Sequence, residues 1–367
     1  MKWKEHLSSL KAYQPGRTID EVKKQYGLET ITKLASNENP YGYSPKVTDV
    51  LKNQAGHFEL YPDGAAVELK SALAAHTGKP AEQIIVGNGS DEIISIISRS
   101  LLRPGINTVM AKPTFSQYKH NAIIERAGIK EVDAVEGKHD LPSMLRAIDA
   151  DTAIVWLCSP NNPSGAYISE EELIPFLDGV DPDVLVVLDE AYREYVVAED
   201  YPDTVPLLDK YPNLIILRTF SKIHGLASFR IGYGIAHKDV IAALDPLREP
   251  FNVNALAQKV AVAALEDRAF VGECKIKNRN GLEQFYAFCR EQNLSYYPSQ
   301  GNFILIDFKV DGDEVFNYLL GKGYIVRSGK ALGYPESVRV TVGSREQNAG
   351  LIDELRSFLK ASAKVNS

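Results

Sequence analysis

The middle of the chain, from about residue 65 to 240, alternates short apolar runs with longer amphipathic stretches. Unbroken apolar runs rich in β-branched residues are typical of strands that helices bury on both faces. These runs occupy residues 83–87, 107–111, 153–158, 184–190 and 213–219. The pattern predicts the α/β class, with a large domain built on a mostly parallel sheet of the seven-stranded type, covered by helices. In such a sheet the chemistry lies beyond the carboxyl ends of the strands.

The pattern changes after about residue 250. A long helical stretch precedes short strand-like runs that are bounded by Gly, Pro and Ser, which favours a smaller α+β domain with antiparallel strands. The first forty residues, with the segments YQPGR and ASNENPYG, are expected to form an extended arm. We therefore predict an arm over residues 1–42 that packs with the small domain, a large domain over 43–250 and a small domain over 251–367.

Composition and charge exclude several classes of protein. Hydrophobic residues make up 44% of the chain, which is too many for a disordered protein. The 41 Lys and Arg residues against 48 Asp and Glu residues leave a net charge of −7, which argues against a nucleic-acid or anionic-membrane binder. Three widely spaced cysteines, no secretory signal and no membrane-length apolar run predict a cytoplasmic globular protein. No spacing of His, Cys and Asp indicates a metal site.

The segments that follow the predicted strands carry candidate chemistry. GNGSDE (87–92) joins a strand to a helix and could hold a phosphate, or could be an ordinary tight turn. It lacks the third glycine of a dinucleotide-binding fingerprint, and no P-loop lysine follows it. Three other segments end strands: SPNNPSG (159–165), Asp189 with Tyr192 after it, and TFSKIHGLASFR (219–230).

Neighbouring parallel strands would bring these segments to one edge of the sheet. An amide, a carboxylate, a phenol, a lysine and a phosphate-binding cluster would then converge, and that set fits pyridoxal 5′-phosphate. A lysine amine forms an imine with the aldehyde of this cofactor. A buried carboxylate keeps the pyridine nitrogen protonated, and the amide and phenol bind the ring's 3-oxygen.

At this point the sequence resembles a known family, the pyridoxal-phosphate-dependent aminotransferases of fold type I, and among them the histidinol-phosphate aminotransferases. The resemblance spans nearly the whole chain. It rests on the order and spacing of YQPG, LASNENPYG, YPDG, GNGSDE, KPTFSQY, SPNNPSG, DEAY, TFSKIHGLASFRIGYG, GNFILID and RVTVGSRE. It implies transfer of an amino group from L-histidinol phosphate to 2-oxoglutarate in histidine biosynthesis, giving imidazole acetol phosphate and glutamate.

The resemblance also implies roles for single residues. Lys222 would be the Schiff-base lysine and proton carrier, Asp189 the partner of the pyridinium nitrogen, and Tyr192 a ligand of the 3-oxygen. Tyr61, in YPDG, matches a tyrosine that the family lends to the neighbouring subunit, which implies a homodimer with shared active sites. Phe115 would stack on the cofactor, unless it is a plain core residue. The implied cofactor-binding residues are Gly89, Ser90, Asp91, Phe115, Asn162, Asp189, Tyr192, Thr219, Ser221, Lys222, Arg230 and Tyr61.

Substrate recognition is implied by Arg327 and Arg339, which match arginines that hold the substrate's phosphate or carboxylate in the family. The guanidinium group has a planar fork that suits either anion. An arginine within an apolar strand such as VRVTV needs a partner, or else faces outward. Tyr13, Asn37 and Asn302 match further positions near the substrate.

Two positions depart from the family's pattern, and other functions stay open. His224 stands where the family carries an aromatic or small residue, and Ser228 stands where it carries a small residue, often glycine. These two departures bear on substrate preference and not on the reaction. An aromatic amino-acid aminotransferase is the main alternative, because the same arginines suit its substrates. Decarboxylation or Cα–Cβ cleavage on the same scaffold also remains open. A non-catalytic cofactor sensor is disfavoured, because Lys222, Asp189 and Asn162 are intact and no DNA-binding module is attached.

Overall fold

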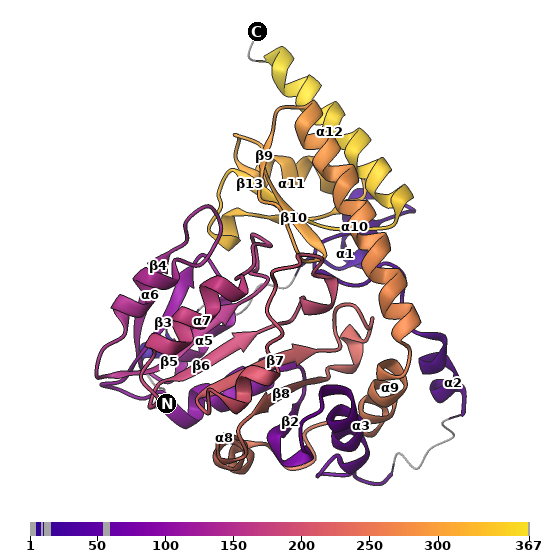
Figure 1. The fold of residues 1–367 in the computed structure, drawn as a ribbon. Coiled ribbons are helices and arrows are strands. Elements are labelled where there is room, and N and C mark those ends of the chain that lie inside the picture. The colour runs from indigo at the N-terminus through magenta and orange to yellow at the C-terminus, as the bar shows by residue number, and fades with distance from the viewer. Residues whose placement is uncertain (1–4, 9, 11–15, 54–58, 366–367) are drawn as a thin grey trace.

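The computed structural model describes residues 5–8, 10, 16–53 and 59–365 (Figure 1). A seven-stranded sheet forms the centre of the larger unit, with strand order β2-β8-β7-β6-β5-β3-β4. All neighbouring strands are parallel except at β8, which is antiparallel to β2 and β7. The strands are β2 (Ile84–Gly87), β3 (Asn107–Lys112), β4 (Gly128–Asp133), β5 (Thr152–Cys158), β6 (Leu185–Asp189), β7 (Leu214–Thr219) and β8 (Gly232–Ala236). The predicted α/β fold is confirmed.

Helices cover both faces of this sheet, as the unbroken apolar runs predicted. Along β5, Val155 and Leu157 face one apolar core, whereas Ile154 and Trp156 face the other. The first core is closed by α2 (Pro45–Asn53), α3 (Val67–Thr77), α6 (Leu141–Ala147), α7 (Glu170–Gly179) and α9 (Ala255–Leu265). The second is closed by α4 (Ser90–Leu101), α5 (Ser116–Ile124) and α8 (Lys238–Leu244).

The smaller unit contains a four-stranded sheet whose neighbouring strands are all antiparallel. Its strands, in sheet order, are β12 (Arg327–Ser328), β13 (Ser337–Thr341), β10 (Phe303–Asp307) and β9 (Ser295–Tyr296). Its helices are α10 (Arg268–Glu291), α11 (Gly312–Gly321) and α12 (Arg345–Val365). Buried side chains of the sheet and of all three helices form one apolar core. Figure 1 shows the long helices α10 and α12 side by side along this unit.

The amino-terminal segment differs from the extended arm that the sequence led us to expect. Residues Ile19–Tyr26 form helix α1, because Thr18 and Glu21 make a reciprocal capping box at its start and Gly27 ends it with a left-handed backbone. Strand β1 (Thr32–Lys33) then pairs in parallel with β11 (Tyr324–Ile325). The segment therefore joins the smaller unit as a helix and a strand.

Helix α9 also lies elsewhere than the predicted boundary at residue 250 implied. That boundary places α9 in the small domain, but α9 packs against α2 and α3. Its buried residues, among them Ala257, Val260 and Ala261, belong to the core under the large sheet. The smaller unit therefore starts later in the chain, with helix α10, which begins at Arg268.

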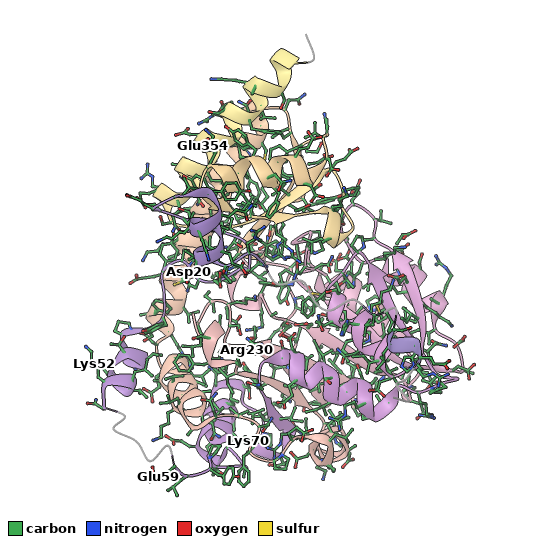
Figure 2. All side chains as sticks on the ribbon, turned by 180° about the vertical axis from the view of Figure 1, so that it is seen from behind. Asp20, Lys52, Glu59, Lys70, Arg230 and Glu354 are labelled. Atoms are coloured by element: carbon green, nitrogen blue, oxygen red, sulfur yellow. The ribbon has the colours of Figure 1, made fainter. Side chains whose placement is uncertain are left out.

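Short 3₁₀ helices connect the main elements. They are η1 (Glu5–Leu7), η2 (Ala81–Gln83), η3 (Arg193–Tyr195), η4 (Pro206–Asp209), η5 (Ala227–Phe229), η6 (Asp245–Leu247) and η7 (Lys330–Leu332). In the part of the chain that the structure describes, no helix combines the length and apolarity that a bilayer crossing requires. In Figure 2, Arg230 lies in the middle of the molecule, between Glu354 in the smaller unit and Lys70 on helix α3 of the larger unit.

Candidate active site

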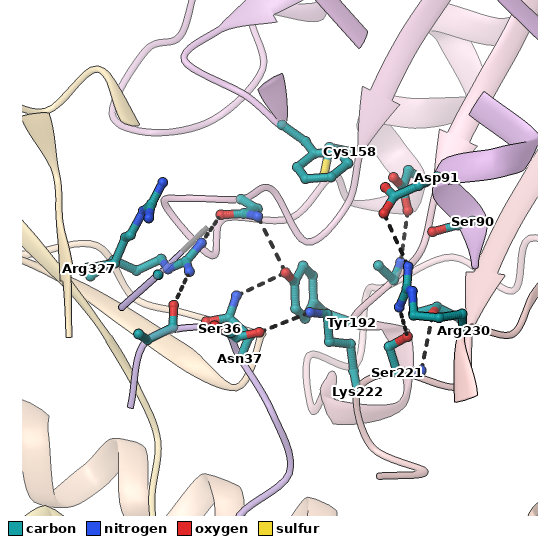
Figure 3. A pocket seen from close by; sticks show the side chains of 18 residues that line it. Ser36, Asn37, Ser90, Asp91, Cys158, Tyr192, Ser221, Lys222, Arg230 and Arg327 are labelled. Atoms are coloured by element: carbon teal, nitrogen blue, oxygen red, sulfur yellow. Dashed lines mark hydrogen bonds and ion pairs between the residues drawn. The ribbon is translucent and has the colours of Figure 1, made fainter. Parts of the chain in front are cut away.

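A pocket opens where strands β5, β6 and β7 end. The register pairs Cys158 with Asp189 across β5 and β6, so the segments that follow these strands start side by side. Residues from the smaller unit and from the segment around Ser36 complete the pocket (Figure 3). The predicted residues that line it are Asn37, Ser90, Asp91, Phe115, Asn162, Asp189, Tyr192, Thr219, Ser221, Lys222, Arg230, Arg327 and Arg339.

Lys222 follows β7 and projects into the middle of this pocket. Its amine donates a hydrogen bond to the carbonyl oxygen of Ser36 at 3.2 Å and lies 5.6 Å from the centre of the Tyr192 ring. Burial, with the nearby charge of Arg339, lowers the pKa of Lys222 to about 8. At pH 7 about a tenth of this amine is therefore neutral and nucleophilic, far more than for an exposed lysine.

Asp189 lies at the end of β6 and is only 3% exposed. Its carboxylate accepts hydrogen bonds from the Tyr118 hydroxyl at 2.7 Å and from the backbone N–H of Ala191 at 3.1 Å. Burial raises the pKa of Asp189 to about 6, because these two neutral donors only partly offset the loss of water. A cationic group that enters the pocket would stabilise this carboxylate.

Tyr118 is a residue that the sequence analysis missed. It lies on α5, is fully buried, and stacks on Trp156 with ring centres 4.7 Å apart. A buried tyrosine within a helix is typical of a core residue, so only its place in the KPTFSQY motif pointed to the site. Its hydroxyl holds Asp189 in place.

One end of the pocket offers hydrogen-bond donors to an anion. Helix α4 begins there at Ser90, and the N-cap residue Gly89 has no side chain with which to cap the first turn. The Arg230 guanidinium donates to the Ser221 hydroxyl at 3.2 Å and lies 3.4 Å from the Asp91 carboxylate. Gly89 has φ +81°, and a Cβ atom there would lie 2.6 Å from the Arg230 guanidinium, so only glycine leaves room for this arrangement.

The opposite end carries two arginines from the smaller unit. Arg327 on β12 and Arg339 on β13 stand directly opposite each other in the sheet, and both line the pocket. Arg339 donates to the Asn162 side-chain oxygen at 2.6 Å and to the Ala35 carbonyl at 2.7 Å. Figure 3 shows Arg327 at the far side of the pocket from Arg230, Ser90 and Asp91. Two positive charges paired on neighbouring strands repel each other, and an anion bound by both would relieve this repulsion.

The remaining predicted residues lie outside this pocket. Tyr61 is 81% exposed and stacks on Phe251 with ring centres 4.5 Å apart. Asn302 is buried, and its amide donates to the backbone carbonyl of Asn37, a pocket residue, at 2.9 Å. Gly89 shapes the anion end without lining it. Tyr13 lies outside the described residues.

The comparisons with known proteins agree with this geometry. A family model described as aminotransferase class I and II matches residues 29–355. The chain belongs to this aminotransferase family. A curated relative from Geobacillus sp. (strain WCH70), named histidinol-phosphate aminotransferase, is 58% identical over 98% of this chain and 99% of its own. A relative of the same name from Anoxybacillus flavithermus is also 58% identical, over 98% of this chain and 97% of its own.

The fold of this aminotransferase also matches that of a solved structure. The histidinol-phosphate aminotransferase of Sinorhizobium meliloti, solved in complex with pyridoxal-5′-phosphate, superposes with a TM-score of 0.88 at 26% sequence identity. The match covers 97% of this chain and 98% of that one. The resemblance that the sequence motifs indicated is confirmed at the level of family and fold.

His224 and Ser228, the two positions that depart from the family's motif, lie beside the aminotransferase site. His224 is buried and packs against Phe220 with ring centres 5.0 Å apart. Burial lowers the pKa of His224 to about 4, so its ring is neutral at physiological pH. Ser228 is exposed on η5. Neither residue lines the pocket.

Proposed function

We propose that this aminotransferase transfers the amino group of L-histidinol phosphate to 2-oxoglutarate, giving imidazole acetol phosphate and glutamate, with pyridoxal 5′-phosphate as its cofactor. This reaction is a step of histidine biosynthesis. The facing pair Arg327 and Arg339 supplies a second site for an anion, and Figure 3 shows Arg327 on the side of the pocket away from Arg230. This pair suits a phosphate or a carboxylate. The observation that carries the choice of histidinol phosphate over an aromatic amino acid is therefore the name shared by the relatives at 58% identity.

The pocket fits the proposed cofactor at each of its charged or reactive groups. The anion end at Ser90, Ser221 and Arg230 suits the phosphate, and Gly89 gives it the space it needs. The buried carboxylate of Asp189 suits a protonated ring nitrogen. The amine of Lys222 suits the aldehyde. Phe115, on the pocket wall, would face the ring.

Pyridoxal phosphate, when bound, supplies an aldehyde that binds amines and a ring that withdraws electrons from them. The chain's own residues then have separate tasks. Lys222 accepts the proton that leaves the substrate α-carbon, for which its amine must be neutral. Tyr192 and Asn162 bind the ring oxygen, and Arg327 and Arg339 hold the substrate anion. The position of Tyr61, exposed beside Phe251, supports a homodimer in which Tyr61 serves the neighbouring subunit.

The substrate assignment predicts a preference in steady-state kinetics. With 2-oxoglutarate as acceptor, kcat/KM for L-histidinol phosphate should exceed that for tyrosine or phenylalanine by about tenfold or more, because the phosphate dianion engages two guanidinium groups. Arg327→Gln should lower kcat/KM for histidinol phosphate about 10- to 100-fold, since a hydrogen bond to a charged group contributes about 1.5–3 kcal/mol. Arg279→Gln, on the exposed face of α10, is the matched control. A parent enzyme that prefers the aromatic amino acids would instead be an aromatic aminotransferase.

The lowered pKa of Lys222 predicts how the empty enzyme takes up its cofactor. Only the neutral amine attacks an aldehyde, so the rate of cofactor capture should rise about tenfold per pH unit below pH 8 and level off above it. An exposed lysine would keep the rate rising to about pH 10. Stopped-flow absorbance of the empty enzyme mixed with pyridoxal phosphate measures this profile. A rate that continues to rise from pH 8 to pH 10 would show that burial does not activate Lys222.

A further inference from the structure

Residues 34–37 form a strap that ties the smaller unit to the functional side chains. The Leu34 carbonyl accepts a hydrogen bond from the backbone N–H of Thr341 at 2.9 Å. The next three residues of the strap then contact one functional side chain each. The Ala35 carbonyl accepts from Arg339, the Ser36 carbonyl accepts from Lys222, and the Asn37 amide donates to Tyr192 at 2.9 Å. Sequence reasoning missed Ala35 and Ser36, because they act through backbone carbonyls, which every residue type has.

Thr341, on β13, fixes the orientation of the Asn37 amide. The backbone N–H of Asn37 can only donate, so the Thr341 hydroxyl oxygen accepts from it at 2.9 Å. The hydroxyl proton is then donated to the side-chain oxygen of Asn37 at 3.0 Å. If the amide were reversed, this proton would lose that acceptor. Thr341 and Asn37 are 2% and 1% exposed, so water cannot substitute for these bonds.

The orientation of a second amide, that of Asn162, is fixed in the same way. Arg339 can only donate, and it donates to the Asn162 side-chain oxygen at 2.6 Å. The Asn162 nitrogen therefore faces the Tyr192 hydroxyl, at 3.4 Å. The Tyr192 oxygen thus accepts from both amides, and its own proton must point in a third direction. Figure 3 shows Tyr192 beside Asn37, and Asn37, Asn162 and Tyr192 all line the pocket.

We propose that Thr341 is a positioning residue that acts through Asn37 to keep the Tyr192 hydroxyl a donor toward the ring oxygen of the bound cofactor. This inference rests on the proposed function, since it requires pyridoxal phosphate in the pocket. Thr341 itself does not line the pocket. Thr341, in the smaller unit, would thus set the direction of the Tyr192 hydroxyl proton in the larger unit, through Asn37 of the strap.

The proposal predicts a spectroscopic shift in the loaded enzyme without substrate. A phenol that donates to the ring oxygen lowers the affinity of that oxygen for the proton it shares with the Lys222 nitrogen. Thr341→Val, which removes both hydroxyl contacts at nearly constant volume, should raise the pH midpoint of the visible absorption band by about 0.5 unit. Thr341→Ser, which keeps the hydroxyl, should return the midpoint to that of the parent. Tyr192→Phe should give a larger rise and marks the upper limit.

Coupling between the two sites separates positioning from a general packing effect. In the Tyr192→Phe background, Thr341→Val should add no further shift, because the route to the ring oxygen is already cut. Lys222, Arg339, Asp189 and Cys158, the charged or titratable groups that act on Tyr192, stay unchanged in every variant. Thr108→Val, a buried threonine of β3 whose hydroxyl bonds to the Ile154 carbonyl, is the matched control and should leave the midpoint unchanged.

Three results would overturn the proposal. An unchanged midpoint in Thr341→Val, or an equal shift with and without Tyr192, would leave Thr341 a purely structural residue. If Thr341→Val does not fold, Thr341→Ala is measured in its place, with thermal unfolding as the check, and an unchanged midpoint there has the same meaning. Failure of the proposed function would look different, because the parent enzyme would then show no visible band with added pyridoxal phosphate.

Discussion

Replacing Lys222 by alanine is expected to lower kcat by about 10³-fold or more, because in the proposed mechanism the variant loses both the nucleophile that binds the cofactor and the base that moves the substrate proton. Lys222 lines the pocket, and burial beside Arg339 holds its pKa at about 8. Steady-state turnover with saturating cofactor measures the loss. The visible absorption of the loaded enzyme, which borohydride removes in the parent, should be absent from the variant.

Two further variants show whether this loss comes from the amine itself. Lys222→Arg keeps a positive charge but cannot act as the amine, so it should be as inactive as Lys222→Ala. Lys238→Ala, on the exposed start of α8, should retain full activity and the visible band. Undiminished turnover by a colourless Lys222→Ala protein would overturn the mechanism.

Replacing Asp189 by asparagine is expected to lower kcat by about 10²-fold or more, because a neutral amide no longer stabilises a protonated ring nitrogen. The carboxylate is held by Tyr118 and by the Ala191 backbone, so asparagine preserves the shape of the site. Turnover and the affinity for pyridoxal phosphate, measured by fluorescence quenching, should both fall. Parent-like turnover in Asp189→Asn would remove this carboxylate from the mechanism.

The same substitution has an opposite effect on the stability of the empty enzyme. Asp189 has a folded-state pKa of about 6, above its ordinary value of 3.8, so between these values the folded state binds the extra proton. The Asp189 charge therefore costs stability progressively as pH rises through this window, and the substitution Asp189→Asn removes that cost. Between pH 5 and 7.5 the unfolding free energy of Asp189→Asn should rise relative to that of the parent, by an amount of the order of 1–2 kcal/mol. Urea unfolding of both empty proteins at the two pH values tests this sign.

Much of the fold could be predicted from the sequence, because a strand buried on both faces leaves an unbroken apolar run. The runs that become β3, β5, β6 and β7 are examples. Strand β4 has no such run, because it is an edge strand without a fully buried residue, and β8 is interrupted by glycines. The place of α9 depends on which apolar surface it covers, and its alanine-rich sequence suits either unit.

The sequence predicted those side chains of the candidate site that belong to recognisable motifs. Lys222, Asp189, Asn162 and Arg230 belong to segments that end neighbouring strands, and parallel pairing brings those ends together. The remaining contacts depend on how distant segments meet. Tyr118 reaches Asp189 from a position 71 residues earlier in the chain, and the strap at Ser36 contacts Lys222 through a backbone carbonyl. Residue type alone carries no sign of either contact.

Spectroscopy of the two half-reactions distinguishes histidinol phosphate from the aromatic amino acids as the amino donor. The loaded enzyme is mixed with L-histidinol phosphate and no acceptor, and the visible band is followed at enzyme concentrations high enough to observe a single turnover. The band should disappear, and it should return when 2-oxoglutarate is added, whereas equal concentrations of tyrosine or phenylalanine should act more slowly. A band that histidinol phosphate leaves unchanged, while tyrosine or phenylalanine removes it, would rule out histidinol phosphate as the main substrate.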